Sequence, residues 1–370
     1  MSERFDATTL LALANRFAQG IPVVSVTRNP SGHINDTFVA LLADGKRFIL
    51  QRINTQVFRH PEELTRNITL VTSFLQKKLL ARGEDPTRGT LTALSSSEGT
   101  LLTPDAQGDL WRAFHYIEGA VTVQRVTEAG QLYQAGRAFG RFQNLLSDFP
   151  AEQLFPVIER FHDTGWRFET LERAVREDPA GRAAAVHAEI DFALARGPRA
   201  GELQALLDAG ELPTRVTHND TKINNVMLDA VTGEAICVID LDTVMPGSLL
   251  FDFGDAIRSG TNTADEDESH LERVHMDLNY YRAFTLGFLE QTAATLTPLE
   301  RELLPSCARW LTYECGIRFL ADHLQGDVYF HVDHPRHNLD RARTQFKLVQ
   351  EMEEKQALME AIPREVLAKA

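Results

Sequence analysis

The residues best suited to chemistry lie close together in one stretch, RVTHNDTKINNVMLD, which covers residues 215–229. Its polar centre holds Asp220, Lys222 and Asn225, and the next apolar run, AICVID, ends at Asp240. A carboxylate can accept or orient the proton of an attacking hydroxyl, oxygen ligands can bind Mg²⁺, and a lysine can offset charge on a transferring phosphoryl group. These residues therefore predict phosphoryl transfer from ATP, with Asp220 as the catalytic base, Lys222 as the neutralising cation, and Asn225 and Asp240 as magnesium ligands.

The segment NVMLDAVTGEAICVID predicts a β-hairpin that would bring these residues together. Two short apolar runs flank a turn at Thr232 and Gly233, so the loop before the first strand and Asp240 after the second should meet at one end. The loop also has the spacing of the kinase catalytic loop, H-x-D-x-K-x-x-N, in which we expect His218 to be a packed anchor. The pattern D-x-x-x-x-N alone also arises by chance in polar loops, so the prediction depends on the elements around it.

The composition of the chain limits the possible functions. Its 370 residues carry a net charge of −14, which argues against a nucleic acid as the main partner, because phosphate backbones require a basic surface. Three cysteines without a CxxC pair are typical of a reducing compartment rather than of a disulfide framework. No stretch reaches the ~20 apolar residues of a membrane helix, and the N-terminal segment lacks the apolar core of a signal peptide. We therefore expect a soluble cytoplasmic protein, a monomer or a weak homo-oligomer, that binds small molecules.

The spacing of apolar residues divides the chain into two parts. After an amphipathic helix capped by Asp6 or Thr8, residues 21–117 consist mainly of short runs typical of strands, with one long helix at about 61–83. Helical spacing then prevails, and the predicted helices cover about 127–147, 152–176, 180–196, 200–209, 265–291, 297–325 and 338–361. With a hinge around Gly119, this pattern predicts a two-lobed α+β fold, with a small β-rich lobe over residues 1–118 and a larger helical lobe over residues 119–370.

Two segments of the helical part resemble the aminoglycoside phosphotransferase and choline kinase superfamily, which has a protein-kinase-like fold. HNDTKINN is similar to its catalytic loop, and VIDLDTVMPGSLLFDFGDAIR is similar to its metal-binding segment. Within the superfamily the resemblance is strongest to the N-acetylhexosamine 1-kinases, because SGHINDTF, FILQRIN, YECGIRFLAD and RTQFKLVQEME extend it over nearly the whole chain. It implies ATP- and Mg²⁺-dependent phosphorylation of the anomeric hydroxyl of N-acetylglucosamine or N-acetylgalactosamine to the sugar 1-phosphate.

The resemblance also implies roles for individual residues of the helical part. Asp220 would orient the anomeric hydroxyl of the sugar, and Asp242 would assist a second metal ion beside Asn225 and Asp240. Asp252 would bond the backbone of the catalytic loop.

The resemblance implies further contacts with the nucleotide and with the sugar. Gly32 would lie in the loop that covers the phosphates, and the adenine would bind at the hinge, at His115, Tyr116 and Ile117. The sugar would be contacted by His33, Asn35 and Arg318. Arg318 could instead pair with Asp322, four residues further along the same helix.

One position departs from the kinase pattern. The third strand of a kinase normally carries a lysine that binds the α- and β-phosphates, whereas FILQRIN places Gln51 there. Gln51 can donate a hydrogen bond to a phosphate but cannot neutralise it. Either Arg52, on the other face of a regular strand, or Lys222 would then take more of the charge, or nucleotide binding would depend more on Mg²⁺. Two alternatives stay open: a kinase for a cationic acceptor such as an aminoglycoside or choline, and a non-catalytic nucleotide-binding protein.

Two other polar segments are expected to be structural. HVDHPRH places His331, His334 and His337 at three-residue spacing, but Pro335 would break a helix that aligned them on a metal, so a solvated loop is favoured. The acidic run ADEDESHLE is expected to begin a helix, because carboxylates are favoured in a first turn.

Overall fold

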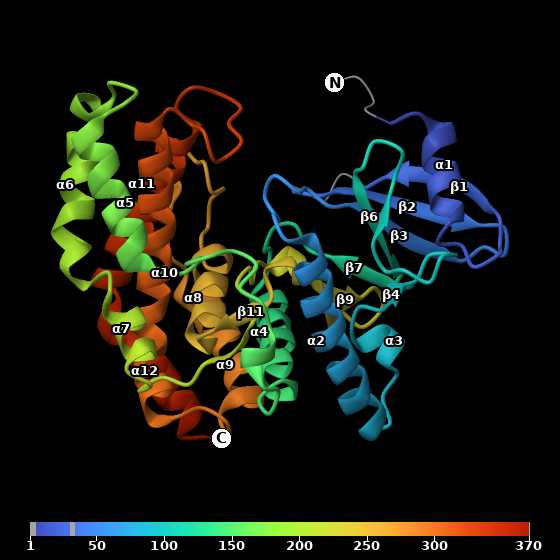
Figure 1. The fold of residues 1–370 in the computed structure, drawn as a ribbon. Coiled ribbons are helices and arrows are strands. Elements are labelled where there is room, and N and C mark those ends of the chain that lie inside the picture. The colour runs from blue at the N-terminus through green and yellow to red at the C-terminus, as the bar shows by residue number, and fades with distance from the viewer. Residues whose placement is uncertain (1–4, 30–33, 370) are drawn as a thin grey trace.

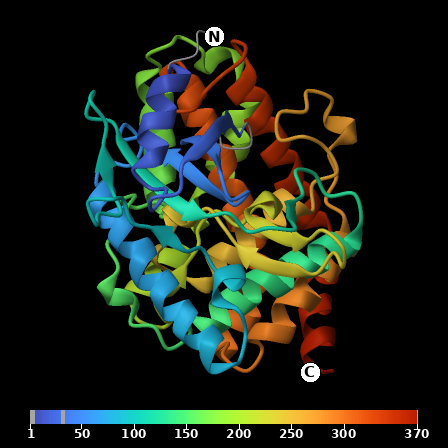
Figure 2. The same ribbon diagram turned by 90° about the vertical axis from the view of Figure 1, so that its right-hand side faces the viewer.

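The structure is a computed structural model that describes residues 5–29 and 34–369. Figure 1 shows a strand-rich part formed by the N-terminal segment, joined to a larger helical part. Figure 2 views the molecule from the side of the N-terminal part, with the C-terminal helices behind it. This arrangement confirms the predicted two-lobed, kinase-like α+β fold.

The N-terminal part is built on an antiparallel sheet with the strand order β1-β2-β3-β6-β4, in which β5 also pairs with β6. The strands are β1 (Val23–Arg28), β2 (Asp36–Leu42), β3 (Arg47–Arg52), β4 (Ala93–Leu94), β5 (Thr103–Pro104) and β6 (Leu110–His115). One face buries Leu50 and Trp111 against helix α1 (Ala7–Asn15), which begins at the N-cap Asp6 as predicted. The opposite face presents Ile49 and Phe114 to the helical part, and side chains alternate between the faces.

Helix α2 (Pro61–Ala81) follows β3 and has proline at its first position, where the missing N–H has no intrahelical partner to lose. Its apolar stripe joins the core of the helical part rather than the core beneath α1. The buried side chain of Asn67 donates to the backbone oxygens of Val244 (3.0 Å) and Phe155 (2.7 Å). Helix α2 is therefore anchored to the helical part, and the short helix α3 (Pro86–Gly89) follows it.

Two small sheets lie at the start of the helical part. Strand β7 (Ala120–Thr122) pairs with β9 (Val226–Asp229), which pairs in turn with β10 (Ala235–Val238). The pairing of β9 with β10 confirms the predicted hairpin. Strand β8 (Arg215–Thr217) pairs with β11 (Met245–Gly247), so the polar loop after β8 lies between these two sheets.

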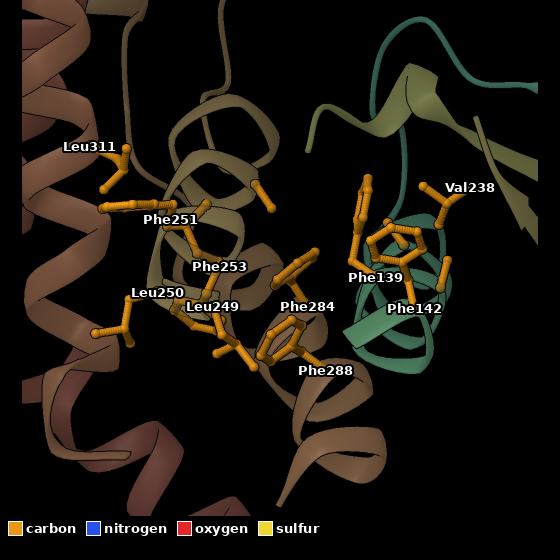
Figure 3. Packing of buried hydrophobic residues seen from close by; sticks show 14 of the residues in the cluster. Phe139, Phe142, Val238, Leu249, Leu250, Phe251, Phe253, Phe284, Phe288 and Leu311 are labelled. Atoms are coloured by element: carbon orange, nitrogen blue, oxygen red, sulfur yellow. The ribbon is translucent and has the colours of Figure 1, made fainter. Parts of the chain in front are cut away.

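The core of the helical part surrounds helix α8 (Leu249–Gly260). Figure 3 shows Phe253 of α8 beside Phe284 and Phe288 of α9 (Leu278–Thr292), with the phenylalanines of α4 (Ala129–Leu145) beyond them. Helices α4 and α9 approach so closely that a Cβ on Gly136 would lie 2.3 Å from the backbone oxygen of Phe284. The other helices are α5 (Thr164–Glu177), α6 (His187–Arg196), α7 (Glu202–Asp208), α10 (Pro298–Gln325), α11 (His337–Glu354) and α12 (Gln356–Leu367).

Several predicted helix boundaries were wrong. The helix expected from 152 begins only at Thr164, where the side chain of Asp163 caps it. The helix expected from 180 begins at His187. The acidic run after residue 264 forms a loop and a short 3₁₀ turn, and α9 begins later, behind the N-cap Asp277. The single helix expected over 338–361 is two helices that meet at Lys355.

Two expectations about the surface can also be compared with the structure. His337 is buried and opens helix α11, with its Nε2 3.1 Å from Asp267, so this part of HVDHPRH is not a solvated loop. Among the described residues, no helix combines the length and the apolar character needed to cross a membrane.

Candidate active site

The backbone of the loop after β8 is held by Asp252, which lies in the first turn of α8. Its fully buried carboxylate accepts hydrogen bonds from the backbone N–H groups of His218 (3.0 Å) and Asn219 (2.8 Å). Burial raises the pKa of Asp252, although these donors oppose the effect. The expected bond between Asp252 and the loop backbone is confirmed, and it fixes the chain directly before Asp220.

His218 and Asn219 have structural positions in this loop. His218 is fully buried, with Nε2 2.9 Å from the backbone oxygen of Ile239 and its ring edge-on to two phenylalanines of α4, as expected for an anchor. Asn219 has a left-handed φ of 66°, which asparagine tolerates better than most residues. Its Nδ2 donates to the backbone oxygen of Thr243 (2.8 Å). These contacts turn the chain so that Asp220 follows on the more exposed side.

Asp220, Lys222 and Asn225 form one contact group. Lys222 Nζ lies 3.2 Å from Asp220 Oδ1, and the two side chains keep 45% and 28% of their surface exposed. Asn225 Nδ2 donates to the backbone oxygen of Asp220 (2.8 Å) and to its Oδ2 (3.2 Å). The charge of Asp220 raises the pKa of Lys222, so the lysine stays protonated. Because the amide nitrogen of Asn225 faces Asp220, its Oδ1 is the atom available to a cation.

Asp240 follows β10, opposite the start of β9, and has a left-handed φ of 59°. The backbone N–H of Ile239 donates to the backbone oxygen of Asn225 (2.9 Å), which ties the two ends of the hairpin together. Desolvation by neighbouring protein atoms, and then the negative charges of Asp242 and Asp220, raise the pKa of Asp240, whose side chain still keeps an exposed surface. Such repulsion between carboxylates favours a bound cation, and Mg²⁺ commonly takes one or two carboxylates together with phosphate oxygens.

The residues present therefore fit a magnesium ion that takes some of its ligands from the protein and the others from a nucleotide. In the described part of the chain, no three His, Cys, Asp or Glu side chains already form a metal cage. Asp240 is exposed, so its oxygens can reach a ligand. Asn225, whose Oδ1 is the second proposed ligand atom, is bonded through its backbone oxygen to Ile239, the residue before Asp240. An all-protein cage is not what Mg²⁺ usually occupies in phosphoryl transfer.

Asp242 lies at the contact between the two parts of the molecule. It is 3% exposed, and its two oxygens accept from Arg112 Nη2 at 2.6 and 2.8 Å. Its Oδ2 also accepts from Asn35 Nδ2 (2.5 Å), and Asn35 Oδ1 accepts from the backbone N–H of Asn54 (2.9 Å). The structure thus brings Asp242 and Asn35 to the site, with both side chains bonded to other residues.

The residues predicted to bind the nucleotide are divided between two faces of the sheet. Gln51 faces the helical part, where its Oε1 accepts from Arg112 Nε and Nη2. Arg52 lies on the face of α1 and is paired with Asp36 (2.6 Å) and Asp109 (3.2 Å), so its guanidinium is directed away from Asp240. Gly32 and His33 lie outside the described residues.

The three residues predicted for the hinge begin with the last residue of β6. His115 is exposed and Tyr116 is half-buried, with the guanidinium of Arg47 3.9 Å from the centre of its ring, whereas Ile117 is buried. Of these three residues, Ile117 is therefore the one packed into the interior.

Arg318 lies in the last third of α10, and its environment differs from the pairing with Asp322 considered above. Its Nη1 is 3.9 Å from Glu314, four residues earlier, and its guanidinium lies over the rings of Phe161 (5.1 Å) and Phe330 (5.6 Å). The suggested pair with Asp322 was wrong, because that carboxylate accepts from the backbone N–H groups of residues 328–330 and from Asn338. Arg318 therefore stays beside aromatic rings with its charge only weakly paired.

A chain of buried contacts connects Arg318 with the loop that holds Asp220. Glu314 lies 2.9 Å from His162 Nδ1, and His162 Nε2 lies 3.2 Å from the backbone oxygen of Asn219. The sequence analysis missed His162 and Glu314, because nothing in their local sequence shows that they would meet.

The sequence analysis also missed an ion pair on α8. Asp255 Oδ2 accepts from the backbone N–H of Thr221 (2.8 Å), and Asp255 Oδ1 lies 2.9 Å from Arg258. Burial would raise the pKa of Asp255, but the charges of Arg258 and Lys222 lower it. The i, i+3 spacing in GDAIR was the available signal.

A cavity of about 690 Å³ lies behind the loop, between residues 156–169, α7 and β11. Its lining includes Trp166, Phe161 and Asn219, but not Asp220, Asn225 or Asp240. The cavity therefore touches this loop at Asn219, whereas the paired side chains of Asp220 and Lys222 lie outside its lining.

Known proteins share this fold. The spectinomycin phosphotransferase APH(9)-Ia, solved with ADP and spectinomycin, matches at a TM-score of 0.54 and 14% identity, over 95% of this chain and 98% of that one. An aminoglycoside phosphotransferase from Alicyclobacillus acidocaldarius matches at 0.60 and 12%, over 99% and 98%. A choline kinase from Cryptosporidium parvum matches at 0.55 and 15%, over 96% and 98%.

The amino-acid sequence gives the family directly. Residues 25–284 match the family described as the phosphotransferase enzyme family, APH. This range covers most of the chain and includes nearly all of the sheet, the predicted hinge, the loop that holds Asp220 and α8. The chain therefore belongs to the APH phosphotransferase enzyme family.

Proposed function

We propose that the protein transfers the γ-phosphoryl group of ATP to the anomeric hydroxyl of an N-acetylhexosamine, N-acetylglucosamine or N-acetylgalactosamine. The observation that supports phosphoryl transfer is the contact group of Asp220, Lys222 and Asn225, tied to Asp240 through the hairpin. The choice of acceptor rests on the sequence resemblance, because the comparisons extend only to the family.

Asp220 is the proposed base. One of its carboxylate oxygens accepts the proton of the sugar hydroxyl as the new O–P bond forms and the bond from phosphorus to the β-phosphate oxygen breaks, with ADP leaving. Lys222 and Asn225 hold this carboxylate in place, at 3.2 Å each. Lys222, which stays protonated, also offsets charge on the transferred group.

Asn225 and Asp240 are the proposed magnesium ligands, with Asp242 as the second carboxylate beside them. Magnesium, when bound, would supply charge neutralisation at the phosphate oxygens. The chain's own contribution is to keep these oxygens at one end of a hairpin whose backbone is fixed by Asp252 and by the bond between Ile239 and Asn225.

An acceptor panel tests the proposal. N-acetylhexosamines, neutral hexoses, aminoglycosides, choline and amino alcohols are each incubated with ATP and Mg²⁺, ADP release is measured, and ³¹P NMR locates the phosphate on the product. We expect turnover with N-acetylhexosamines and a phosphate on the anomeric oxygen. Turnover confined to amines would refute the choice of acceptor, and stabilisation by ATP without transfer to any acceptor would refute the kinase reaction.

Two variants separate the base from general effects. Asp220→Asn should fold normally and lose about 10²–10⁴-fold in kcat, the usual contribution of a positioned base. Asp229→Asn makes the same change at the far end of the hairpin, where the carboxylate pairs with Arg88, and should keep wild-type turnover. Equal activity of the two variants would remove Asp220 from the reaction.

A further inference from the structure

On the face of the sheet that meets the helical part, Arg112 lies beside Gln51. The sequence analysis did not assign a cation to this position. Gln51, at the position where kinases have a lysine, is directly opposite Arg112 in the register of β3 and β6. Residues that face each other in an antiparallel pair lie on the same side of the sheet. The guanidinium of Arg112 therefore occupies the region that a lysine at position 51 would reach.

The contacts of Arg112 use only part of its hydrogen-bonding capacity. Its Nε and Nη2 donate to Gln51 Oε1 at 3.1 and 2.9 Å, and Nη2 also donates to both oxygens of Asp242. The residue is 4% exposed, yet its Nη1 is buried without a hydrogen-bond partner among the residues that the structure describes. A buried charged donor without an acceptor is unfavourable, and an anionic oxygen would satisfy it.

A purely structural role explains less of this arrangement. A cation that only balanced the charge of Asp242 would explain the hydrogen bonds of Nη2. It would not explain why the buried Nη1 has no hydrogen-bond partner among the described residues. It would also not explain why Gln51 accepts from Nε and Nη2 of the same guanidinium and is itself held by Thr37 Oγ1, at 3.1 Å from Gln51 Nε2. Gln51 and Asp242 together hold the guanidinium of Arg112 in one orientation. Asp242 lies two residues after Asp240 in the sequence.

We propose that Arg112 binds the nucleotide phosphates, as the cation that replaces the missing strand-β3 lysine, and that Gln51 holds its guanidinium in position. The inference rests on the proposed use of ATP. It assigns the charge that Gln51 cannot supply to a residue of β6, rather than to Arg52, whose guanidinium is paired with Asp36 and Asp109 on the other face of the sheet.

Nucleotide binding, measured by calorimetry without any acceptor, tests this assignment. ADP with Mg²⁺ and adenosine alone are titrated into the wild type and into Arg112→Gln. We expect the dissociation constant for ADP to rise about 10- to 100-fold, as for the loss of one charge-assisted contact, while that for adenosine stays the same. Arg16→Gln is the matched control in the same part of the molecule, because Arg16 pairs with Glu98, and it should bind ADP like the wild type.

A second variant guards against misfolding, because Arg112→Gln leaves the buried Asp242 without its partner. In the double variant Gln51→Lys with Arg112→Gln, a lysine returns to the usual position, and ADP affinity should recover most of the loss. Unchanged ADP affinity in Arg112→Gln, an equal loss for ADP and adenosine, or no recovery in a folded double variant would each overturn the proposal. A wild type that binds no adenine nucleotide would instead refute the proposed function.

Discussion

Removing the carboxylate of Asp252 should loosen the catalytic loop and lower the stability of the whole protein. Asp252→Ala leaves the N–H groups of His218 and Asn219 and the Nε2 of Gln143 without this acceptor, all of them buried. Two unsatisfied backbone donors cost about 1–3 kcal/mol each. Part of that cost is offset, because burial raises the pKa of this carboxyl and its removal ends an unfavourable desolvation. We therefore expect the free energy of unfolding to fall by about 2–4 kcal/mol.

Urea unfolding measures this loss, and hydrogen–deuterium exchange localises it to residues 215–225. Asp252→Asn keeps one acceptor oxygen, so its stability should lie between the wild type and Asp252→Ala. Asp208→Ala is the control, because Asp208 is exposed and bonded only to Gln204 among the contacts that the structure records, and it should change stability by no more than about 0.5 kcal/mol. An Asp252→Ala protein with the wild-type urea midpoint and unchanged amide exchange in the loop would refute the reasoning.

Three further predictions follow from the packing and the charges. Gly136→Ala should lower thermal stability strongly, since its Cβ would meet backbone 2.3 Å away, whereas Gly130→Ala in the same helix, with nothing within 4 Å, should raise it by up to about 1 kcal/mol; a similar melting temperature for both would contradict the close helix contact. Burial would raise the pKa of Glu351, but hydrogen bonds, first from Lys355, lower it to about 2. The stabilisation by ionised Glu351, at most about 3 kcal/mol, is therefore complete above the unfolded pKa of about 4.3 and should be lost as pH falls towards 2. In Glu351→Gln the free energy of unfolding should depend less steeply on pH between pH 5 and 3, and the same pH dependence in both proteins would exclude this contribution. Burial raises the pKa of the Cys237 thiol to about 12, so this thiol should not react with a disulfide reagent at pH 8 before unfolding, and rapid labelling of Cys237 in the native protein would show that the packing is wrong.

Much of the fold could be predicted from local patterns in the sequence. The strands around Phe48 and Trp111 and helix α2 follow apolar periodicity, and the hairpin follows its turn. Periodicity fails where a helix start depends on a cap rather than on apolar spacing. The region before α9 shows this, because an acidic run there looked like a first turn while the cap was Asp277, further along the chain.

The contacts within the loop of the candidate site could also be predicted from local sequence. Asp220, Lys222 and Asn225 lie within six residues, so their mutual contacts depend on one loop and on a hairpin whose ends must meet. The alternation of side chains in β3 also separates Gln51 from Arg52 without any tertiary information.

Only the tertiary structure decided which distant residues complete the site. Arg112 and Asp242 are 130 residues apart, and Asp252 reaches a backbone group 34 residues before it. Such contacts depend on how the sheet and the helices pack, and no local spacing encodes that. The sequence alone determined the family, the hairpin and the residue types of the loop beside it. The packing of the two parts determined which cation faces the site, because a buried guanidinium is positioned by carboxylate and amide partners from different elements.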